Sequence, residues 1–290
     1  MPMTIHRKLE WLVLAILVLN GAGPAVSAGS AQEKDTTWNR ALPIGAKWAL
    51  QQGIDLPNPF GIGVFLVTMT RDIEVYDVRV KLPGDEPVSI SNVASFDVRN
   101  HTTLGAVKVD AWILPLLNLY ALAGHTWTDT RLNVAVTIDR IIGDPLVINA
   151  TQDSDVGGPL FGVGATAVAG YGHWFIMADA NYVYSDIEEL GGIGAWFISA
   201  RTGWSGPIRW GSWRAWAGAA YLAADRTLSV SEESPILGTV QVEVDQRPVN
   251  PMTLQAGGSI GIGKRWELML EAGSNFDDAF VGVFSASFRF

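Results

Sequence analysis

Three short stretches contain residue types that catalytic and ligand sites use. His125 lies shortly before Asp129, which would suit a base and its orienting acid, but no serine nucleophile is near it in the sequence. Residues 258–264, GSIGIGK, have the spacing of a phosphate-binding loop, yet Arg265 stands where that loop requires Ser or Thr. Residues 153–158 begin like a calcium loop and lack its later bidentate Glu. None is complete, so we predict that the protein is not an enzyme and holds no metal ion or cofactor.

A second set of charged residues is spread along the chain and alternates with apolar residues. In residues 103–113, Lys108 and Asp110 alternate with Val107 and Val109. Inside a barrel such charges have two possible arrangements: they pair into a network that fills the interior, or they line a thin aqueous path whose charge sets selectivity. The predicted lumen-lining residues are Lys108, Asp110, Asp179, Arg201, Arg214, Glu267 and Glu271.

The elements that carry these charges are predicted to be β-strands, because apolar residues recur with a period of two from residue 60 onward. Within residues 251–263, Leu254 and Ile260 fall on one face, and Gln255 and Ser259 on the other. Most candidate strands have the roughly 9–11 residues that a tilted membrane strand needs. The ten candidates lie near residues 60–70, 103–113, 117–127, 158–170, 173–184, 193–204, 213–224, 251–263, 265–273 and 279–290.

The connections between these strands alternate in length. Short turns such as residues 264–265 alternate with long, acidic connections, a layout that is typical of an outer-membrane barrel. The long connections are residues 71–102, 128–157 and 225–250. Inside two of them, residues 72–82 and 239–246 also alternate, and we expect these to be hairpin extensions above the membrane.

The predicted fold is therefore all-β: an antiparallel up-and-down transmembrane β-barrel of about ten strands, with eight or twelve as alternatives. A soluble barrel also alternates, but it keeps its apolar face inside and covers its exterior with charge. Here the second face of the strands consists of Gly, Ser, Thr and a few charges, which suits a narrow lumen. An even number of strands places both termini in the periplasm.

Aromatic residues gather next to the short turns. Because amphipathic rings prefer the headgroup boundary, this clustering predicts an aromatic girdle at the periplasmic membrane interface. The predicted girdle residues are Trp112, Tyr171, Trp174, Trp204, Trp210, Trp213, Trp266, Phe288 and Phe290.

The N-terminal part of the chain has the pattern of an export signal. The apolar run at residues 11–19 follows a basic stretch and is shorter than the about 20 apolar residues of a transmembrane helix, and Ala28 ends a cleavage motif. We predict a signal peptide over residues 1–28, a periplasmic segment or partial plug over residues 29–59, and the barrel over residues 60–290. The chain has no cysteine and a formal net charge of −9, which excludes disulfides and argues against a nucleic-acid partner.

At the level of class, the chain resembles bacterial outer-membrane β-barrel proteins. The resemblance rests on the export signal, the strand pattern and the aromatic ending Phe288-Arg289-Phe290, although Ser285 stands where a glycine is usual. It implies a location in the outer membrane of a Gram-negative bacterium and contact with outer-membrane lipid and lipopolysaccharide. It also implies that the barrel assembly machinery recognises the C-terminal strand.

For function, the leading hypothesis is a narrow passive channel or transport barrel for small solutes that uses the inward charges. A second hypothesis is a non-conducting barrel that is structural or binds a surface partner through acidic extracellular loops. A third is an outer-membrane lipid hydrolase or protease.

Overall fold

The computed structural model describes residues 38–81, 87–89, 94–138, 146–187, 191–224, 226–234 and 238–290. The predicted signal peptide at residues 1–28 and residues 29–37 of the predicted periplasmic segment lie outside the described residues. The elements are α1 (Ala46–Gln51), β1 (Phe60–Lys81), β2 (Val88–Ser89), β3 (Ala94–Leu114), β4 (Leu117–Ile138), β5 (Leu146–Tyr171), β6 (Trp174–Ile187), β7 (Gly191–Ile208), β8 (Gly211–Ala223), β9 (Arg226–Ser234), β10 (Gly238–Pro248), β11 (Met252–Ile262), β12 (Trp266–Ser274) and β13 (Ala279–Arg289).

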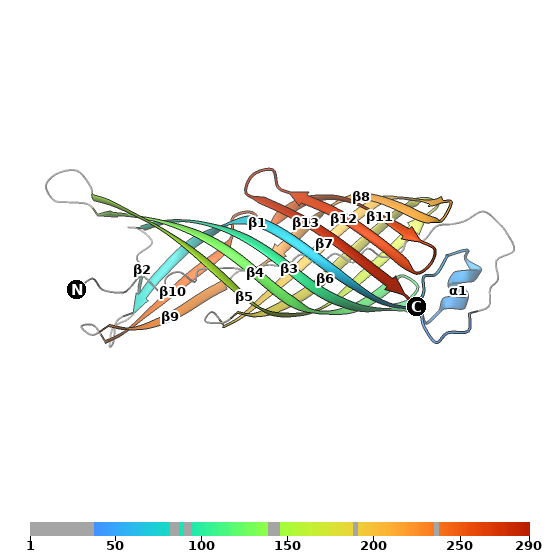
Figure 1. The fold of residues 1–290 in the computed structure, drawn as a ribbon, viewed down its shortest axis with the longest axis horizontal. Coiled ribbons are helices and arrows are strands. Elements are labelled where there is room, and N and C mark those ends of the chain that lie inside the picture. Colours follow the sequence, from blue (N-terminus) through green and yellow to red (C-terminus); the bar gives the residue numbers. More distant parts are fainter. Residues whose placement is uncertain are drawn as a thin grey trace.

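Ten of these strands form a closed antiparallel barrel (Figure 1). The ring runs β1-β3-β4-β5-β6-β7-β8-β11-β12-β13, and β13 pairs back with β1 over eleven residue pairs, from Gly61 with Arg289 to Arg71 with Ala279. Closure leaves the barrel without an open edge. The predicted up-and-down barrel of ten strands is thus confirmed, and the alternatives of eight and twelve strands are wrong.

Four neighbouring strands are much longer than a membrane requires. β1, β3, β4 and β5 have 22, 21, 22 and 26 residues, against the roughly 9–11 of a spanning strand. Beyond Arg71, β1 leaves β13 and pairs with β10 instead, and β9 pairs with β10. A sheet in the order β9-β10-β1-β3-β4-β5 therefore projects from one end of the barrel (Figure 1). We call it the projecting sheet.

The projecting sheet corrects the expected long loops. Residues 128–138 and 146–157, which we predicted as part of one loop, continue β4 and β5 as a paired ladder. The reason is that a polar stretch such as residues 128–131 or 151–155 does not end a ladder when both strands continue to hydrogen-bond each other. The extensions predicted at residues 72–82 and 239–246 form paired strand structure over most of their length, in β1 and β10.

The end of the barrel opposite the projecting sheet carries the tight β3–β4, β5–β6, β7–β8 and β11–β12 turns, and we call it the short-turn end. The C-terminus and α1 lie at this end (Figure 1). Here the backbone N–H of Ile44 donates to the carbonyl of Ile113 at 2.8 Å, and that of Trp112 to the carbonyl of Pro59 at 2.8 Å. The described N-terminal segment, residues 38–59, is therefore attached to the base of the barrel.

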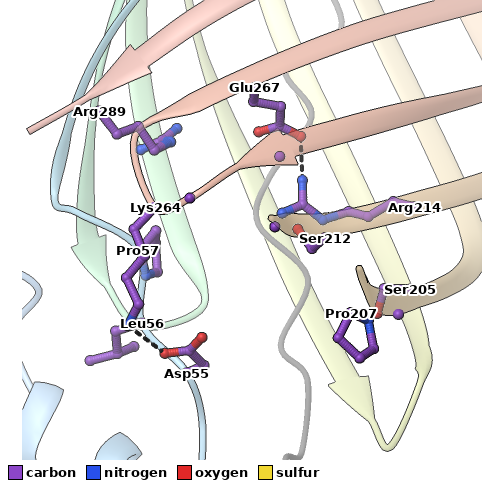
Figure 2. Close-up of a pocket in the computed structure, with 14 residues that line it drawn as sticks. Asp55, Leu56, Pro57, Ser205, Pro207, Ser212, Arg214, Lys264, Glu267 and Arg289 are labelled. Carbon is purple, nitrogen blue, oxygen red and sulfur yellow. Dashed lines mark hydrogen bonds and ion pairs between the residues drawn. The ribbon is translucent and has the colours of Figure 1, made fainter. Parts of the chain in front are cut away.

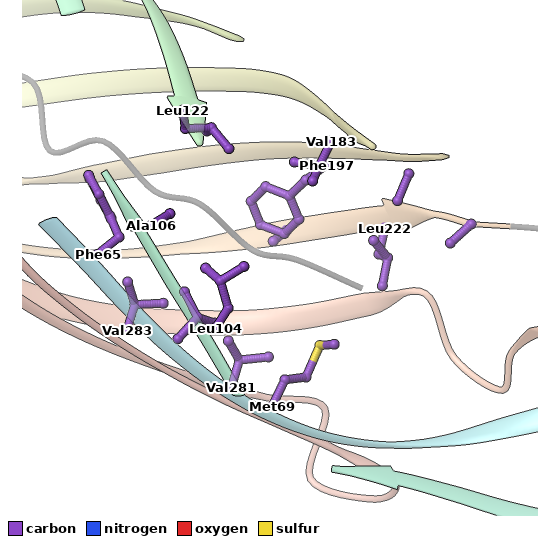
Figure 3. Close-up of a cluster of buried hydrophobic side chains, with 14 of the residues drawn as sticks. Phe65, Met69, Leu104, Ala106, Leu122, Val183, Phe197, Leu222, Val281 and Val283 are labelled. Carbon is purple, nitrogen blue, oxygen red and sulfur yellow. The ribbon is translucent and has the colours of Figure 1, made fainter. Parts of the chain in front are cut away.

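A band of large apolar side chains lines the interior farther from the short turns (Figure 3). Phe65, Met69, Leu104 and Phe197 are each buried to 95% or more. The expectation that the inward face holds only small polar residues and a few charges is therefore wrong for this part of the barrel. The reason lies in strands such as β1, which are apolar on both faces. Other members of the band are Leu122, Val183, Leu222, Val281 and Val283.

Candidate functional site

The seven predicted lumen charges all point into the barrel, on the short-turn side of the apolar band. Six are at most 7% exposed as whole residues, and the Arg214 side chain is 9% exposed. Arg289 on the last strand joins them. The resulting charged layer holds four cations, Lys108, Arg201, Arg214 and Arg289, and four carboxylates, Asp110, Asp179, Glu267 and Glu271. Its formal charge is zero.

The most deeply buried pair in this layer is Arg201 with Glu271, whose side chains are 0% and 1% exposed. Nε of Arg201 lies 2.8 Å from Oε2 of Glu271 and Nη2 lies 3.2 Å from Oε1, so the contact is bidentate. Nη1 donates to Oγ of Ser199 at 2.7 Å, and Nε1 of Trp216 donates to Oε2 of Glu271 at 2.6 Å. Several hydrogen bonds thus compensate for removing these two charges from water.

Two further pairs lie nearer the short-turn end. Nη1 of Arg214 donates to Oε1 of Glu267 (Figure 2). Nη2 of Arg289 donates to Oδ1 of Asp110 at 2.8 Å, and Nδ2 of Asn118 donates to the same oxygen at 2.6 Å. Each arginine of the layer therefore has a carboxylate partner.

The remaining two charges, Lys108 and Asp179, are connected through Tyr120. Nζ of Lys108 lies 4.0 Å from the centre of the Tyr120 ring, a cation–π contact. The Tyr120 hydroxyl donates to Asp179 at 3.0 Å, and Thr166 and Asn181 donate to the same carboxylate at 2.6 and 3.1 Å. Tyr120 therefore contacts both charged side chains: its ring contacts Lys108 and its hydroxyl donates to Asp179.

None of the three ion pairs in this layer joins neighbouring strands. Arg201 on β7 and Arg214 on β8 both reach β12, and Arg289 on β13 reaches β3. In the barrel order each pair skips at least one strand. The contacts therefore depend on barrel curvature, and side chains from distant strands fill the lumen at this level. Pairing into a network, one of the two arrangements left open above, is what the described residues show.

Gly164 leaves space for Tyr120 in this layer, and this gives a first prediction. A Cβ at residue 164 would lie 2.4 Å from Cζ and 2.5 Å from the hydroxyl of Tyr120. Gly164→Ala should displace the ring from Asp179 and lower the free energy of unfolding by about 1–3 kcal/mol. Urea unfolding followed by tryptophan fluorescence measures the loss. Gly105→Ala is the matched control, since its Cβ would meet Leu66 at an ordinary 3.8 Å; equal midpoints for the two variants would contradict the expectation.

Most of the predicted girdle residues lie on the outer surface. Tyr171, Trp174, Trp204, Trp210, Trp213, Trp266 and Phe290 are 40–86% exposed. The Phe288 ring packs 5.0 Å from that of Trp266. Trp112 is wrongly assigned, because it is 1% exposed and lies inside the barrel, 5.8 Å from the Arg289 guanidinium. Alternation explains the error, since Trp112 is two residues from Asp110 and shares its inward face.

A second ring of exposed aromatics, absent from the predicted set, lies farther up the outer wall. It consists of Trp127, Tyr182, Tyr184, Trp196 and Tyr221, which are 36–53% exposed. On β6, Trp174 and Tyr184 are ten residues apart, which is about 33 Å along a strand and about 25 Å along the axis of a tilted barrel. Between the two rings most of the outward residues are apolar, with Thr202 and His125 as exceptions, and Asp72, Asp129 and Asp155 follow beyond the upper ring. The outer wall thus carries an apolar band of membrane thickness.

The three incomplete motifs do not form sites within the described part of the chain. His125 faces outward and packs against Trp127 with ring centres 4.7 Å apart, whereas Thr126 is fully buried on the inner side. Residues 258–262 belong to β11, and residues 153–158 belong to β5. Among the described residues, no three His, Asp or Glu side chains are grouped to hold a metal ion. The absence of enzyme activity stays a prediction.

Neither a protein-family model nor a curated protein matches the sequence. Similar solved structures include the outer membrane protein OprG from Pseudomonas aeruginosa, at 10% identity over 81% of this chain and 99% of that chain, with a TM-score of 0.42. The translocator domain of the autotransporter NalP from Neisseria meningitidis matches at 12% identity over 84% and 93%, with a TM-score of 0.37. The Ralstonia pickettii toluene transporter TbuX matches at 10% identity over 81% and 90%, with a TM-score of 0.34. These neighbours are bacterial outer-membrane β-barrels, and the chain is similar to them in being a closed antiparallel barrel.

Proposed function

We propose that this protein is an outer-membrane barrel that is closed to ions and acts through its projecting sheet. The observation that carries the proposal is the charged layer, in which every arginine is paired with a carboxylate and the formal charge is zero. An ion passing along the lumen would have to break these pairs and then cross the apolar band. Both steps are costly, because neither offers a substitute for the hydration shell of the ion.

The outer wall supports the placement in a membrane. Residues such as Leu254, Leu268 and Leu270 are 41–67% exposed, and they lie between two aromatic rings at the spacing of a bilayer. The partners on this surface would be outer-membrane lipid and, in the outer leaflet, lipopolysaccharide. Within the described residues, no helix is long and apolar enough to cross a membrane.

The projecting sheet supports a role outside the membrane. It adds about ten residues to each of four strands, and the β9–β10 hairpin widens it. Its strands and their connections contain more acidic than basic residues, so a positively charged partner is favoured. Binding of a cationic probe peptide to proteoliposomes, compared with its acidic counterpart, tests this part of the proposal.

Planar-bilayer recording tests the closed lumen. We expect the wild-type protein to give no openings above background, because the ion pairs and the apolar band block the path. Arg201→Gln and Arg214→Gln should remain silent as well, since the apolar band is unchanged in both. Regular openings in the wild-type protein would contradict the proposal.

The second candidate is the narrow passive channel for small solutes, and one observation favours it. A cavity at the short-turn end reaches Arg214, Glu267 and Arg289, so polar molecules can approach the charged layer from that side. If the protein is such a channel, the wild type should open in these recordings, and Arg214→Gln should open with a different ion selectivity. The same recordings therefore distinguish the two candidates.

A further inference from the structure

The cavity at the short-turn end has the size of a site for a small molecule. It has a volume of about 220 Å³ and lies between the N-terminal segment and the charged layer (Figure 2). Asp55 and Pro57 contribute to one wall, and Arg214, Glu267 and Arg289 contribute to the other. A single buried water needs roughly 10–15 Å³, and drug-sized ligands occupy about 300–1,000 Å³. The volume lies between these limits and suits a small polar molecule.

Two arginines that line this cavity each retain a hydrogen-bond donor without an acceptor. Nε of Arg214 and Nε of Arg289 are buried and make no hydrogen bond. The remainder of each guanidinium is held in place, by Glu267 for Arg214 and by Asp110 for Arg289. Both side chains are 9% exposed, so these N–H groups are largely removed from water. A buried donor without an acceptor is unfavourable. Neither Nε has appreciable accessible surface, so a small shift of the side chain would have to accompany binding of a ligand oxygen to it.

The residues that line the cavity carry one more positive than negative charge. Its lining contains three cations, Arg214, Lys264 and Arg289, against two carboxylates, Asp55 and Glu267. Both carboxylates already have a cationic partner, because Asp55 lies 3.2 Å from Nζ of Lys264 and Glu267 pairs with Arg214. The third cation, Arg289, pairs with Asp110, which is not part of the lining. The hydroxyl of Ser212 adds a further polar group to the lining.

We propose that this cavity binds a small oxyanion, either phosphate or a small carboxylate, which accepts hydrogen bonds from Arg214 and Arg289. Guanidinium groups suit such ligands, because their planar N–H donors match the geometry of carboxylate and phosphate oxygens. The bound anion would contact the N-terminal segment on one side and the charged layer on the other. It would therefore strengthen the attachment of residues 38–59 to the barrel.

Isothermal titration calorimetry of the full-length protein in detergent micelles tests the proposal. The probes are inorganic phosphate and succinate, with chloride at matched ionic strength as the reference. We expect saturable binding of at least one probe, and which one binds tells phosphate from carboxylate. The double variant Arg214→Gln/Glu267→Gln removes one unsatisfied Nε without changing the net charge of the lining, and it should bind about tenfold more weakly or worse. Arg247→Gln, a substitution in the projecting sheet, should bind as the wild type does.

The following results would overturn the proposal. Absence of saturable binding to the wild-type protein overturns the proposal, and so does unchanged affinity in a double variant that retains the electrophoretic mobility of a folded barrel. If the double variant does not fold, Ser212→Leu is used in its place. The larger side chain would occupy the cavity, so we expect this variant to lose binding. Binding that persists in Ser212→Leu places the anion elsewhere and also overturns the proposal.

Discussion

Replacing Arg201 with Gln is expected to lower the free energy of unfolding by about 3–5 kcal/mol. The substitution removes the arginine partner of Glu271, whose side chain is 1% exposed, and the donor from Trp216 cannot compensate for the lost bidentate contact. Urea unfolding of the protein in detergent or lipid vesicles measures the change. Substituting both partners, as Arg201→Gln/Glu271→Gln, should cost less than the single change, because a neutral amide then replaces the carboxylate that has lost its arginine.

The matched control for this prediction is an exposed ion pair in the projecting sheet. Nε of Arg247 lies 2.9 Å from Oε2 of Glu74, and the two side chains are 52% and 45% exposed. Arg247→Gln should change the free energy of unfolding by no more than about 1 kcal/mol, since water solvates both groups in the folded and unfolded states. A cost for Arg201→Gln as small as this one would show that the interior of the barrel is open to water.

The second large effect concerns the outer wall. Leu270 lies near the middle of β12 and is 67% exposed, between the two aromatic rings. In lipid vesicles, Leu270→Arg should lower the free energy of unfolding by about 2–4 kcal/mol, because the guanidinium would be placed in hydrocarbon. A soluble barrel would tolerate the same change almost without loss, since an exposed arginine would then be in water.

Val249 provides the comparison for Leu270. It is 49% exposed and its N–H donates to the carbonyl of Asp72, which places it beyond the upper aromatic ring. Val249→Arg should change the free energy of unfolding by about 0.5 kcal/mol or less. Equal, small effects of the two substitutions would mean that the whole outer wall contacts water, and the membrane placement would have to be abandoned.

Alternation along the sequence was sufficient to predict the ten barrel strands, without the extensions of β4 and β5, and the direction of the seven lumen charges. A period of two assigns each residue to a face, and the high cost of a charge in lipid identifies the charged face as the inner one. The ion-pair partners of these charges could not be predicted. Arg201 and Glu271, for example, lie three strands apart, and their contact depends on the stagger of the strands in the closed barrel. The role of Tyr120 could not be predicted for the same reason.

The errors have physical reasons as well. Phe65, Val67 and Met69 occupy inward positions of a strand whose outward positions are also apolar, so the hydrophobic pattern did not separate its faces. Trp112 was assigned to the girdle on its distance from a turn, although alternation places it with Asp110. The extensions of β4 and β5 begin with polar residues, and the alternation that resumes at residues 132–138 was not recognised, so only the pairing between them reveals that they are strands.

The connection of the charged layer across non-adjacent strands has a consequence for the order of folding. A partly assembled sheet cannot neutralise all of these charges, because Arg289 and Asp110 meet only after the last strand has reached the first. In a partly assembled sheet some of these charges lack their partners. Contact of the sheet with water is then more favourable than insertion into lipid. The residue pairs between β1 and β13 join residues more than two hundred positions apart. Their formation therefore has a large loop-closure entropy cost and is expected to be slow. Insertion and neutralisation of the interior should then occur as one cooperative event, which begins when β13 pairs with β1.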